Sequence, residues 1–536
     1  MINGQTVWNE EIVTDMLCKK VSPTREITTY NTPCQSLYDL LTDNLSIYAD
    51  KTAIVDNDGS SYRYSQLKEL ADSFSEILYH QYSISSGQHV ALLLYNSIEY
   101  CISLLALSKL GAIIIPLSTK NTPAELSAMI TASNTEAILC ASNFFDALHS
   151  SQPLLNIISA DDILPACHSW SQTDDVPAVA NQYSNTAFLL FTSGTTAGSK
   201  IVVIKNYNLI HAVISYQRIL GVTAKDQTII PIPLFYVTGL VALFSLFIYA
   251  KGTIYLHKYF DTQRILDDVK MQHITLLHAS PTIFTKLLEL SSDFPLLPSL
   301  RAFVCGSSNM PKQRLLQIHQ WLPQLVFHTV YGLTETTSPA TIFPSDAATS
   351  PHIGSSGLPI PGLLVKITDE QDRELPPLEI GEVQLSGSNL LDSYLDIDCD
   401  ALQNGWLATG DLGYLTADGY LFIMDRKKDM INRGGEKIWC LEVENVLLQM
   451  EEIREAAVFG IPHDTYGEVP VAAIECHSDR HLSESKIIAF LSEKIAKYKI
   501  PTAFQFWEHI PLTRNSKINK TYLRNHFNPN FKGEET

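Results

Sequence analysis

The sequence has little positive charge for its size and no paired cysteines. Its 536 residues include 38 Lys and Arg against 57 Asp and Glu, a formal net charge of −19. A surface this negative repels phosphate backbones and anionic lipid, which argues against broad binding to nucleic acid. The nine cysteines are odd in number, scattered and free of C-x-x-C pairs. They indicate neither a disulfide framework nor a zinc site, and are typical of the reducing cytoplasm.

The sequence also lacks a secretory signal and an unbroken membrane-spanning run. Its first residues, MINGQTVWNEEIVTDML, contain no basic segment followed by an apolar core. Residues 229–250 form an uncharged stretch long enough to cross a bilayer, but Pro231, Pro233 and Gly239 interrupt its first half. The remaining run, 240–250, has the length of a buried core helix. We therefore expect no transmembrane segment.

Most of the chain alternates short β-rich runs with helical runs. Residues 89–96, 97–111 and 112–118 have the patterns of a strand, a helix and a strand. A second series of the same kind extends from about residue 200 to about residue 345. Because βαβ units place their strands in parallel, the pattern predicts an α/β fold of parallel sheets with helices on both faces.

The pattern changes after about residue 350. Gly and Pro punctuation predicts a small, mostly antiparallel β subdomain with strands at 353–362, 363–369, 381–387 and 419–425. Mixed helix and strand patterns follow, and the acidic and basic residues of this last part balance. We predict a large N-terminal domain over 1–425 and a small α+β C-terminal domain over 426–536. The negative charge then belongs to the large domain.

A loop of small and hydroxylated residues follows an apolar strand pattern in FLLFTSGTTAGSK (188–200). Small residues let backbone N–H groups approach phosphate oxygens, while hydroxyls and a lysine add donors and positive charge. The glycine spacing differs from that of a Walker A loop. The segment predicts a phosphate cradle, with a flexible surface linker as the alternative. Its candidate ligands are Thr192, Ser193, Gly194, Thr195, Thr196 and Lys200.

A hydroxyl and a carboxylate are adjacent in YGLTETTS (331–338), directly after the strand pattern of 325–330. Strand carboxyl ends are where open α/β sheets bind ligands. Mg²⁺ takes one or two carboxylates together with phosphate oxygens, so Glu335 beside Thr334 is a candidate magnesium ligand. The alternative is a helix N-terminus in which Thr334 is the cap and Glu335 interacts with the helix dipole, and both interpretations are compatible.

Three further residues are weak signals when taken singly. GWLATGDLG (405–413) places Asp411 in a glycine-bounded turn, where a carboxylate can accept both hydroxyls of a ribose. Arg426, in DRKKDMINRGGEKI (425–438), can donate to the same sugar. PLTRNSKINK (511–520) places Lys517 in a polar loop. An ordinary turn, a solvated charge run and a surface lysine are the alternatives.

Seven segments together resemble, in order and spacing, the core motifs of the adenylate-forming superfamily, which includes acyl-CoA and aryl-CoA synthetases, stand-alone adenylation enzymes and beetle luciferases. The resemblance covers roughly residues 35–525. It implies a hinge between the two domains and a C-terminal lid that rotates between two half-reactions. A carboxylate first attacks the α-phosphate of ATP, and a thiol then attacks the acyl-adenylate. The segments are TSGTTAGSK, PLFYVTGL (233–240), CGSSNMP (305–311), YGLTE, GWLATGDLG, DRKKDMINRGGEKI and the loop around Lys517.

The resemblance also implies a role for each matching residue. The loop 192–200 would hold the β- and γ-phosphates, Thr334 would contact them, and Glu335 would hold Mg²⁺. Asp411 and Arg426 would bind the ribose, and Lys517 would lie between the incoming carboxylate and the α-phosphate. A cation there neutralises two anions that must meet, which suits the transition state. The residues at the adenine would be Gly306, Ser307, Ser308, Tyr331 and Gly332.

Further matches concern the hinge, the thiol and the acid. Lys428 matches the hinge position, where a change of φ and ψ swings the lid. Gly434 and Gly435 would admit a pantetheine arm in the thioester-forming pose, with a tight turn as the alternative. No acidic residue in PLFYVTGL could hold an amino group, so amino acids are disfavoured, whereas fatty and aryl acids remain. The acid pocket would be lined by Tyr236, Thr238, Val330 and Ser338.

The chain departs from the usual motifs at several positions without losing a charge that the chemistry needs. Tyr236 replaces a histidine that many acyl-CoA synthetases carry and joins Lys517, Thr334 and Glu335 in the expected catalytic set. The other departures are Ala197, Ser199, Ile201, Ser516 and Cys440.

These observations predict an active ligase that uses ATP, Mg²⁺ and coenzyme A. Coenzyme A is favoured as the acceptor because no carrier domain follows Lys517. The alternatives are a stand-alone enzyme that loads a carrier protein, and a nucleotide-binding relative without turnover. A homodimer is compatible with either enzyme.

Overall fold

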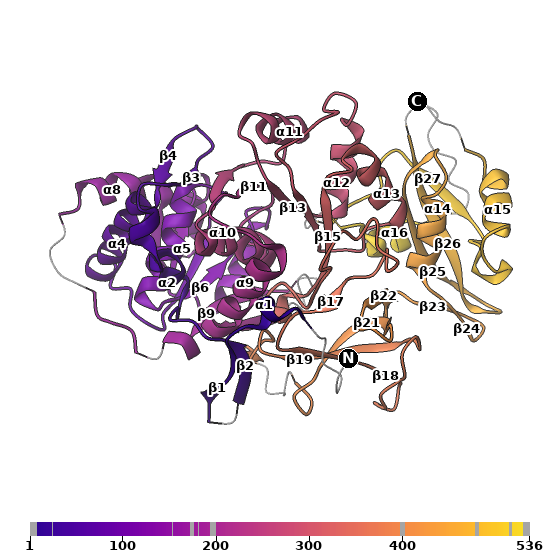
Figure 1. The fold of residues 1–536 in the computed structure, drawn as a ribbon, viewed down its shortest axis with the longest axis horizontal. Coiled ribbons are helices and arrows are strands. Elements are labelled where there is room, and N and C mark those ends of the chain that lie inside the picture. Colours follow the sequence, from indigo (N-terminus) through magenta and orange to yellow (C-terminus); the bar gives the residue numbers. More distant parts are fainter. Residues whose placement is uncertain are drawn as a thin grey trace.

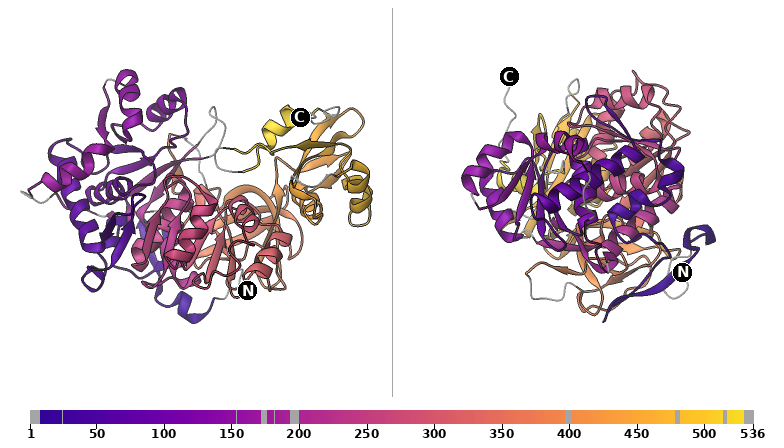
Figure 2. Two further views of the ribbon diagram at one scale, coloured as in Figure 1. Left: turned by 90° about the horizontal axis from the view of Figure 1, so that it is seen from above. Right: turned by 90° about the vertical axis from the view of Figure 1, so that its left-hand side faces the viewer.

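The computed structural model describes residues 8–23, 25–152, 154–171, 176–180, 182–192, 200–396, 402–477, 482–513 and 517–528. Figure 1 shows a large body built from the N-terminal and central parts of the chain, with the yellow C-terminal part at one end. Seen from above, this C-terminal part stands beside the body as a separate layer (Figure 2). The predicted α/β fold, with a large N-terminal and a small C-terminal domain, is confirmed.

The first sheet of the body has seven strands in the order β20-β10-β9-β6-β5-β7-β8. Its apolar strands β5 to β9 run parallel, while β10 and β20 are antiparallel additions at one edge. Helix α5 follows β5, begins at the Ser97 cap and ends at Gly111, whose φ of 69° suits a glycine. The strands are β5 (His89–Leu93), β6 (Ile113–Pro116), β7 (Ala137–Cys140), β8 (Asn156–Ser159), β9 (Thr186–Phe191), β10 (Ile201–Lys205) and β20 (Ser393–Tyr394).

The second sheet has nine strands in the order β17-β16-β15-β14-β13-β11-β12-β3-β4. Its central strands from β15 to β3 run parallel, and antiparallel pairs close both edges. The parallel sheets expected from the βαβ pattern are therefore present. The strands are β3 (Thr52–Val55), β4 (Ser61–Arg63), β11 (Gln227–Ile230), β12 (Thr253–Leu256), β13 (Leu276–Ala279), β14 (Ala302–Cys305), β15 (Val326–Tyr331), β16 (Thr341–Ile342) and β17 (Leu358–Pro359).

One large apolar core joins the two sheets, because helices α5 and α9 contribute side chains to it together with strands of both. Helix α9 is buried along most of its length, and its buried residues include the polar Asn208, His211 and Ser215. The main helices are α4 (Tyr64–His80), α5 (Ile98–Leu110), α6 (Pro123–Ala132), α7 (Ser142–Ser151), α8 (Ile163–Ser169), α9 (Asn206–Leu220), α11 (Thr262–Met271), α12 (Pro281–Glu289) and α13 (Lys312–Trp321).

The long apolar run of the sequence is a buried helix, as expected. Residues Thr238–Ser245 form a π-helical segment that continues into α10 (Leu246–Ala250), and nearly all of their side chains are buried. The π-helical geometry was not predicted. A Cβ on Gly239 would approach the Pro233 carbonyl oxygen to 2.6 Å, so the first turn of this segment requires glycine. No helix in the described part of the chain is long and apolar enough to cross a membrane.

The predicted antiparallel β subdomain is a four-stranded sheet. It contains β18 (Leu363–Thr368), β19 (Gly381–Gly387), β21 (Leu407–Leu415) and β22 (Leu421–Arg426). The expectation of another of its strands at 353–362 is wrong, because only Leu358–Pro359 is extended there, and it pairs with β16 of the nine-stranded sheet. Positive φ values at Gly354 and Gly357 end the extended conformation.

The C-terminal domain has its own sheet and its own apolar cores. Helix α15 ends at Ser492, and a short 3-10 turn, Lys497–Lys499, follows. Strand β27 pairs with β26 in parallel, while the other strand pairs are antiparallel. The elements are β23 (Ile431–Arg433), β24 (Glu436–Ile438), α14 (Cys440–Leu447), β25 (Ile453–His463), β26 (Gly467–Cys476), α15 (Glu484–Ser492), β27 (Phe504–Trp507) and α16 (Lys520–Asn525).

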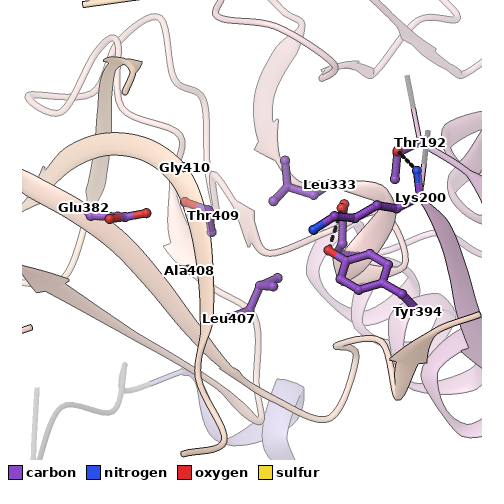
Figure 3. Close-up of a pocket in the computed structure, with 10 residues that line it drawn as sticks. Thr192, Lys200, Leu333, Glu382, Tyr394, Leu407, Ala408, Thr409 and Gly410 are labelled. Atoms are coloured by element: carbon purple, nitrogen blue, oxygen red, sulfur yellow. Dashed lines mark hydrogen bonds between the residues drawn. The ribbon is translucent and has the colours of Figure 1, made fainter. Parts of the chain in front are cut away.

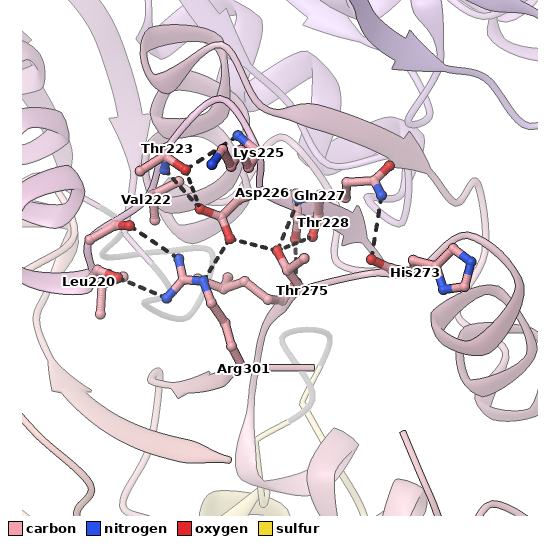
Figure 4. Close-up of polar contacts among 12 residues, drawn as sticks. Leu220, Val222, Thr223, Lys225, Asp226, Gln227, Thr228, His273, Thr275 and Arg301 are labelled. Atoms are coloured by element: carbon pink, nitrogen blue, oxygen red, sulfur yellow. Dashed lines mark hydrogen bonds and ion pairs between the residues drawn. The ribbon is translucent and has the colours of Figure 1, made fainter. Parts of the chain in front are cut away.

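A buried carboxylate ties the amino ends of β11, β13 and β14 together (Figure 4). Asp226 Oδ1 accepts hydrogen bonds from Arg301 Nε at 2.6 Å and from Thr275 Oγ1 at 2.7 Å. Arg301 also donates to the Leu220 carbonyl oxygen at the end of α9. Burial raises the pKa of Asp226, but the bonds from Arg301, Thr223 and Thr275 outweigh burial, so the pKa lies below its usual value.

Replacing Arg301 with methionine is expected to lower the free energy of unfolding by about 1–3 kcal/mol at neutral pH, because the Asp226 carboxylate loses its charged partner. Arg301 is partly exposed, and solvent screening of its charge limits the effect. A carboxyl group whose pKa is lower in the folded than in the unfolded protein stabilises the fold at pH values above its unfolded pKa. That stabilisation is lost as the pH falls through the folded pKa. Urea unfolding should therefore show a difference between the two proteins that shrinks in acid. A difference that is the same at pH 7 and pH 3 would contradict this role.

Candidate functional site

A cavity of about 360 Å³ lies between the seven-stranded sheet and the four-stranded sheet. Figure 3 shows side chains from both sides pointing into it. It adjoins the carboxyl ends of β9 in the seven-stranded sheet and β15 in the nine-stranded sheet. Parallel sheets bind ligands at this end of their strands. The lining residues are Thr192, Lys200, Leu333, Glu335, Glu382, Tyr394, Leu407, Ala408, Thr409 and Gly410.

The predicted phosphate loop begins and ends at this cavity. The Thr192 N–H donates to the Lys200 carbonyl oxygen at 2.9 Å, and the Lys200 N–H donates to Thr192 Oγ1 at 3.2 Å. These bonds close the base of the loop. The candidates between these two residues, Ser193, Gly194, Thr195 and Thr196, lie outside the described residues, as do the departures Ala197 and Ser199.

Glu335 points its carboxylate at the same cavity from a 3-10 turn, Thr334–Thr336. Tyr394 Oη donates to Glu335 Oε1 at 3.1 Å, and Lys200 Nζ lies 4.5 Å from the centre of the Tyr394 ring. The alternative in which Thr334 caps the turn is wrong, because Leu333 is at that position. A Cβ on Gly332 would lie 1.5 Å from the Ser338 carbonyl oxygen, so only glycine permits this turn.

The donor set around the cavity fits Mg²⁺. Among the described residues, no group of three or more His, Cys, Asp or Glu side chains converges as an all-protein metal cage would require. Two carboxylates line the cavity, and Glu382 is paired with Lys427 Nζ at 2.7 Å. Glu335 with the Thr192 hydroxyl is then the sparse set that Mg²⁺ uses when phosphate and water supply its other ligands.

Asp411 lies within β21 and not in the glycine-bounded turn that was expected. Gly410, the residue before it, has a φ of 71°, which distorts the strand locally without ending it. Asp411 is 4% exposed, accepts a hydrogen bond from Tyr331 Oη at 2.7 Å, and lies 3.4 Å from Arg426 Nε, its neighbour on β22. Burial raises its pKa, while Arg426 and the Tyr331 bond oppose that effect. The structure thus brings the predicted ribose and adenine residues together.

Lys517 of the C-terminal domain lies close to this pair. The Thr513 N–H donates to the Lys517 carbonyl oxygen at 2.6 Å, which holds the lysine in a tight loop after β27. Burial lowers the pKa of Lys517 to about 8, the Arg426 charge lowers it too, and the Asp411 carboxylate raises it. Because these charges act on Lys517 directly, the C-terminal domain is seen in a pose that presents Lys517 to the predicted nucleotide site.

Lys428 lies in an exposed turn directly after β22, the last strand of the body. The Asp429 and Met430 N–H groups both donate to the Arg426 carbonyl oxygen, which shapes the turn. Lys428 is also near enough to lower the pKa of Asp411. Its role as a hinge stays a prediction.

The other adenine candidates follow β14. Gly306 is buried and its N–H donates to the Ala279 carbonyl oxygen, while Ser307, with a φ of 73°, and Ser308 are exposed. A Cβ on Gly306 would lie 3.4 Å from the carbonyl oxygen of Val330 on the neighbouring strand, which leads into Tyr331. Gly306 and Tyr331 therefore lie on adjacent strand ends.

The predicted acid-pocket residues divide into two groups. Val330 lies beside Gly306, and Ser338 Oγ lies 3.0 Å from Tyr216 Oη of α9. Tyr236 packs against Phe235 with ring centres 4.4 Å apart, just before Thr238 starts the π-helical segment. Their role as an acid pocket stays a prediction.

Gly434 and Gly435 form the turn between β23 and β24 and have φ values of 61° and 97°. The turn alternative is therefore correct for this pose. Lys437 Nζ of the same hairpin lies 3.9 Å from Glu370 Oε1, next to the connection between β18 and β19, and the glycines do not line the cavity. A role toward pantetheine stays a prediction and requires a different pose.

Sequence reasoning missed Tyr394 and the contacts that hold the C-terminal domain in place. Tyr394 belongs to a two-residue strand outside every motif, so no local pattern signals it. Arg454 of β25 pairs with Glu289 of α12 at 2.8 Å, and its carbonyl oxygen accepts from Arg314 Nη2 of α13 at 2.7 Å. These contacts join surfaces far apart in sequence.

Two family models match this chain. The model described as AMP-binding enzyme matches residues 41–395, and the model described as AMP-binding enzyme C-terminal domain matches residues 442–517.

Curated relatives and solved structures agree with these matches. A 2-succinylbenzoate–CoA ligase of Bacillus licheniformis is 32% identical over 82% of this chain and 89% of its own length. A long-chain-fatty-acid–CoA ligase of Mycobacterium tuberculosis is 29% identical over 87% and 93%. The o-succinylbenzoate CoA synthetase of Bacillus subtilis with its acyl-adenylate intermediate superposes with a TM-score of 0.81, at 29% identity over 92% of this chain and 99% of that one. The same enzyme is also known with ATP and a magnesium ion, at a TM-score of 0.80 and 28% identity.

The family match extends over more than half of the chain, and the cavity, the Asp411–Arg426 pair and Lys517 lie together as the motifs of this superfamily imply. The chain belongs to the AMP-binding enzymes, the adenylate-forming superfamily.

Proposed function

We propose that this protein is an AMP-forming acid–thiol ligase, which activates a fatty or aryl acid with ATP and transfers the acyl group to coenzyme A. One observation carries the proposal. Lys517 of the mobile domain of this family is held beside Asp411 and Arg426, the pair placed to bind the ribose. A cation delivered there can meet both the acid and the α-phosphate.

In the first half-reaction, a carboxylate oxygen attacks the α-phosphorus, the bond to the bridging oxygen of the β-phosphate breaks, and pyrophosphate leaves. In the second, a thiolate attacks the acyl carbon and AMP leaves. The attack brings two anions together, so the Lys517 ammonium contributes by neutralising charge that accumulates in the transition state.

The other residues bind and orient. Asp411 accepts from the ribose hydroxyls while Tyr331 and Arg426 hold its carboxylate in place. Lys200 and the N–H groups of the phosphate loop receive the β- and γ-phosphates. Glu335 and Thr192 would hold Mg²⁺, which when bound offsets the charge of the triphosphate.

The fatty and aryl alternatives both have support in the names of relatives, a 2-succinylbenzoate–CoA ligase and a long-chain-fatty-acid–CoA ligase. Coenzyme A is the acceptor that both names share. The eight cysteines in the described part of the chain are all free thiols, which supports the reducing compartment that the sequence predicts. A cytoplasmic location, a carrier-protein acceptor and a homodimer stay predictions.

The proposal is tested in two stages. Pyrophosphate release is first measured with a panel of fatty, aryl and amino acids in the presence of ATP and Mg²⁺. Coenzyme A or a holo carrier protein is then added to the acyl-adenylate that has formed. We expect pyrophosphate with a fatty or aryl acid and thioester with coenzyme A. Nucleotide binding without pyrophosphate from any acid contradicts the ligase, and transfer to the carrier alone contradicts the acceptor.

Replacing Lys428 with proline is expected to slow thioester formation by about tenfold or more while adenylation falls by no more than about threefold. Proline fixes φ at one value, so it restricts the rotation that the second half-reaction needs. Rapid-quench measurement of each half-reaction separates the two rates, and Lys428→Ala, which keeps the backbone free, is the control. Equal loss in both half-reactions would contradict a hinge at this residue.

A further inference from the structure

His278 is a buried histidine whose ring nitrogens are both unpaired. It lies in β13, is 1% exposed, and neither Nδ1 nor Nε2 has a hydrogen-bond partner among the described residues. Buried polar atoms are nearly always paired, since an unpaired one forfeits the bonds that water makes in the unfolded chain. The hydroxyl of Ser280, two residues further on, is also buried and without a partner there. Two such groups at one strand end require an explanation.

His278 lies among residues of the predicted acid pocket. A Cβ on Gly306 would be 3.5 Å from His278 Nε2 and 3.7 Å from Val330 Cβ, so the imidazole and Val330 flank the same point. On its other side the imidazole packs edge-on against Tyr216, with ring centres 6.1 Å apart. Tyr216 in turn is hydrogen-bonded to Ser338. The histidine thus lies between Val330, which flanks Gly306, and the Tyr216–Ser338 pair.

Gly306 leaves space beside His278 Nε2. A Cβ at this position would make only ordinary contacts, the nearest at 3.4 Å, and the φ of Gly306 lies outside the left-handed region. Neither crowding nor backbone strain therefore requires glycine. The absent side chain leaves room for about one carbon atom beside the buried Nε2. This space lies at the carboxyl end of parallel strands, the edge at which α/β sheets bind ligands.

The imidazole is neutral at physiological pH, because burial lowers the pKa of His278 to about 3. A neutral imidazole presents one N–H donor and one acceptor, and a serine hydroxyl can do both. Such a pair suits an uncharged oxygen atom, in a carbonyl or a hydroxyl, and offers no counter-charge to an anion.

We propose that His278, assisted by Ser280, selects acids that have a carbonyl or hydroxyl oxygen on the carbon skeleton, away from the reacting carboxylate. This inference rests on the proposed function, because it requires the acid to bind beside Gly306 and Val330. The substrate is an oxo- or hydroxy-substituted fatty or aryl acid. An unsubstituted acid leaves the imidazole unpaired and dry, and sites with unpaired buried polar groups reject such analogues strongly.

The test compares matched pairs of acids that differ only in the oxygen. Benzoylpropionate with phenylbutyrate, hydroxybenzoates with methylbenzoates, and hydroxydecanoate with undecanoate cover both acid classes. We expect the kcat/KM for pyrophosphate release to favour the oxygenated member of at least one pair by about tenfold or more in the wild-type protein. In His278→Leu, that ratio should fall toward one. His278→Asn, which keeps a donor and an acceptor, should retain part of it.

His328 provides the matched control. It is a buried histidine on β15, but its Nδ1 lies 2.7 Å from the Phe343 carbonyl oxygen. His328→Leu should leave the acid ratio unchanged and lower the melting temperature, because it breaks a bond. His278→Leu should not lower the melting temperature, because it removes polar atoms without partners.

Two results would overturn the assignment and leave the ligase intact. The first is equal kcat/KM for both members of every pair in the wild-type protein. The second is an unchanged ratio in a folded His278→Leu variant. Absence of pyrophosphate with every acid would instead contradict the proposed function itself, and the inference with it.

Discussion

The Lys517→Ala variant is expected to lose about 100-fold or more in the rate of adenylation. Lys517 is held beside Asp411 and Arg426, where the acid and the α-phosphate of ATP would meet, and its ammonium offsets charge that develops only as they react. Thioester formation from supplied acyl-adenylate does not join two anions and should remain largely intact. Single-turnover measurements of pyrophosphate and of acyl-CoA give the two rates separately.

Lys437 of the same domain provides the control for a change of charge on the lid. Its ammonium lies 3.9 Å from Glu370 in the connection between β18 and β19, and it does not line the cavity. Lys437→Ala should therefore leave both half-reactions near wild-type rates. A loss shared equally by the two half-reactions of Lys517→Ala would show that the lysine supports the fold and not the first step.

The same lysine predicts the pH dependence of adenylation. Its pKa is lowered to about 8, mainly by burial, so the neutral amine becomes the main form of the free enzyme above that pH. Because only the ammonium neutralises charge, kcat/KM for adenylation should fall as the pH rises through about 8. In Lys517→Arg this decline should move to much higher pH, since a guanidinium stays protonated. A profile that is flat to pH 10 in the wild-type protein would contradict the assignment.

The Glu335→Gln variant should have the second-largest effect, a fall of about 100-fold in adenylation at ordinary Mg²⁺ concentrations. Its carboxylate lines the cavity together with the Thr192 hydroxyl, whereas the other acidic lining residue, Glu382, is paired with Lys427. The amide keeps the size of the side chain and loses the charge. Raising the Mg²⁺ concentration should recover part of the activity, which a defect in folding would not show.

Tyr394→Phe separates the charge of Glu335 from the bond that orients it. It removes the hydroxyl that donates to Glu335 and keeps the ring beneath Lys200. We expect a loss of about tenfold or less, because the carboxylate remains. If Tyr394→Phe were as damaging as Glu335→Gln and Mg²⁺ rescued neither variant, orientation and not metal binding would be the role of the pair.

The sequence predicted those parts of the fold that follow from local periodicity. Strands β5 and β6 and the intervening helix α5 lie where the apolar runs placed them, because each run has the period of its element and ends at a cap or a glycine. The segment 353–362 was mistaken for a strand because its Gly and Pro residues were taken as the punctuation of short strands, whereas positive φ at Gly354, Gly357 and Gly362 turns the chain.

For the site, the motifs predicted which residues meet but not how. Asp411, Arg426 and Tyr331 come from three segments, and only the pairing of β21 with β22 and the end of β15 shows that they form one cluster. Tyr394 and His278 carry no motif. Tyr394 matters because it donates to Glu335, and His278 because its ring nitrogens have no partner among the described residues. Neither fact can be read from a local sequence pattern.

The central claim is that a carboxylate oxygen attacks the α-phosphorus of ATP. Incubating the protein with ATP, Mg²⁺, coenzyme A and an acid labelled with oxygen-18 in its carboxylate tests it directly, with mass spectrometry of the nucleotide product. We expect AMP that contains one labelled oxygen for each thioester formed, together with unlabelled pyrophosphate. Unlabelled AMP, or ADP with labelled inorganic phosphate, would contradict it.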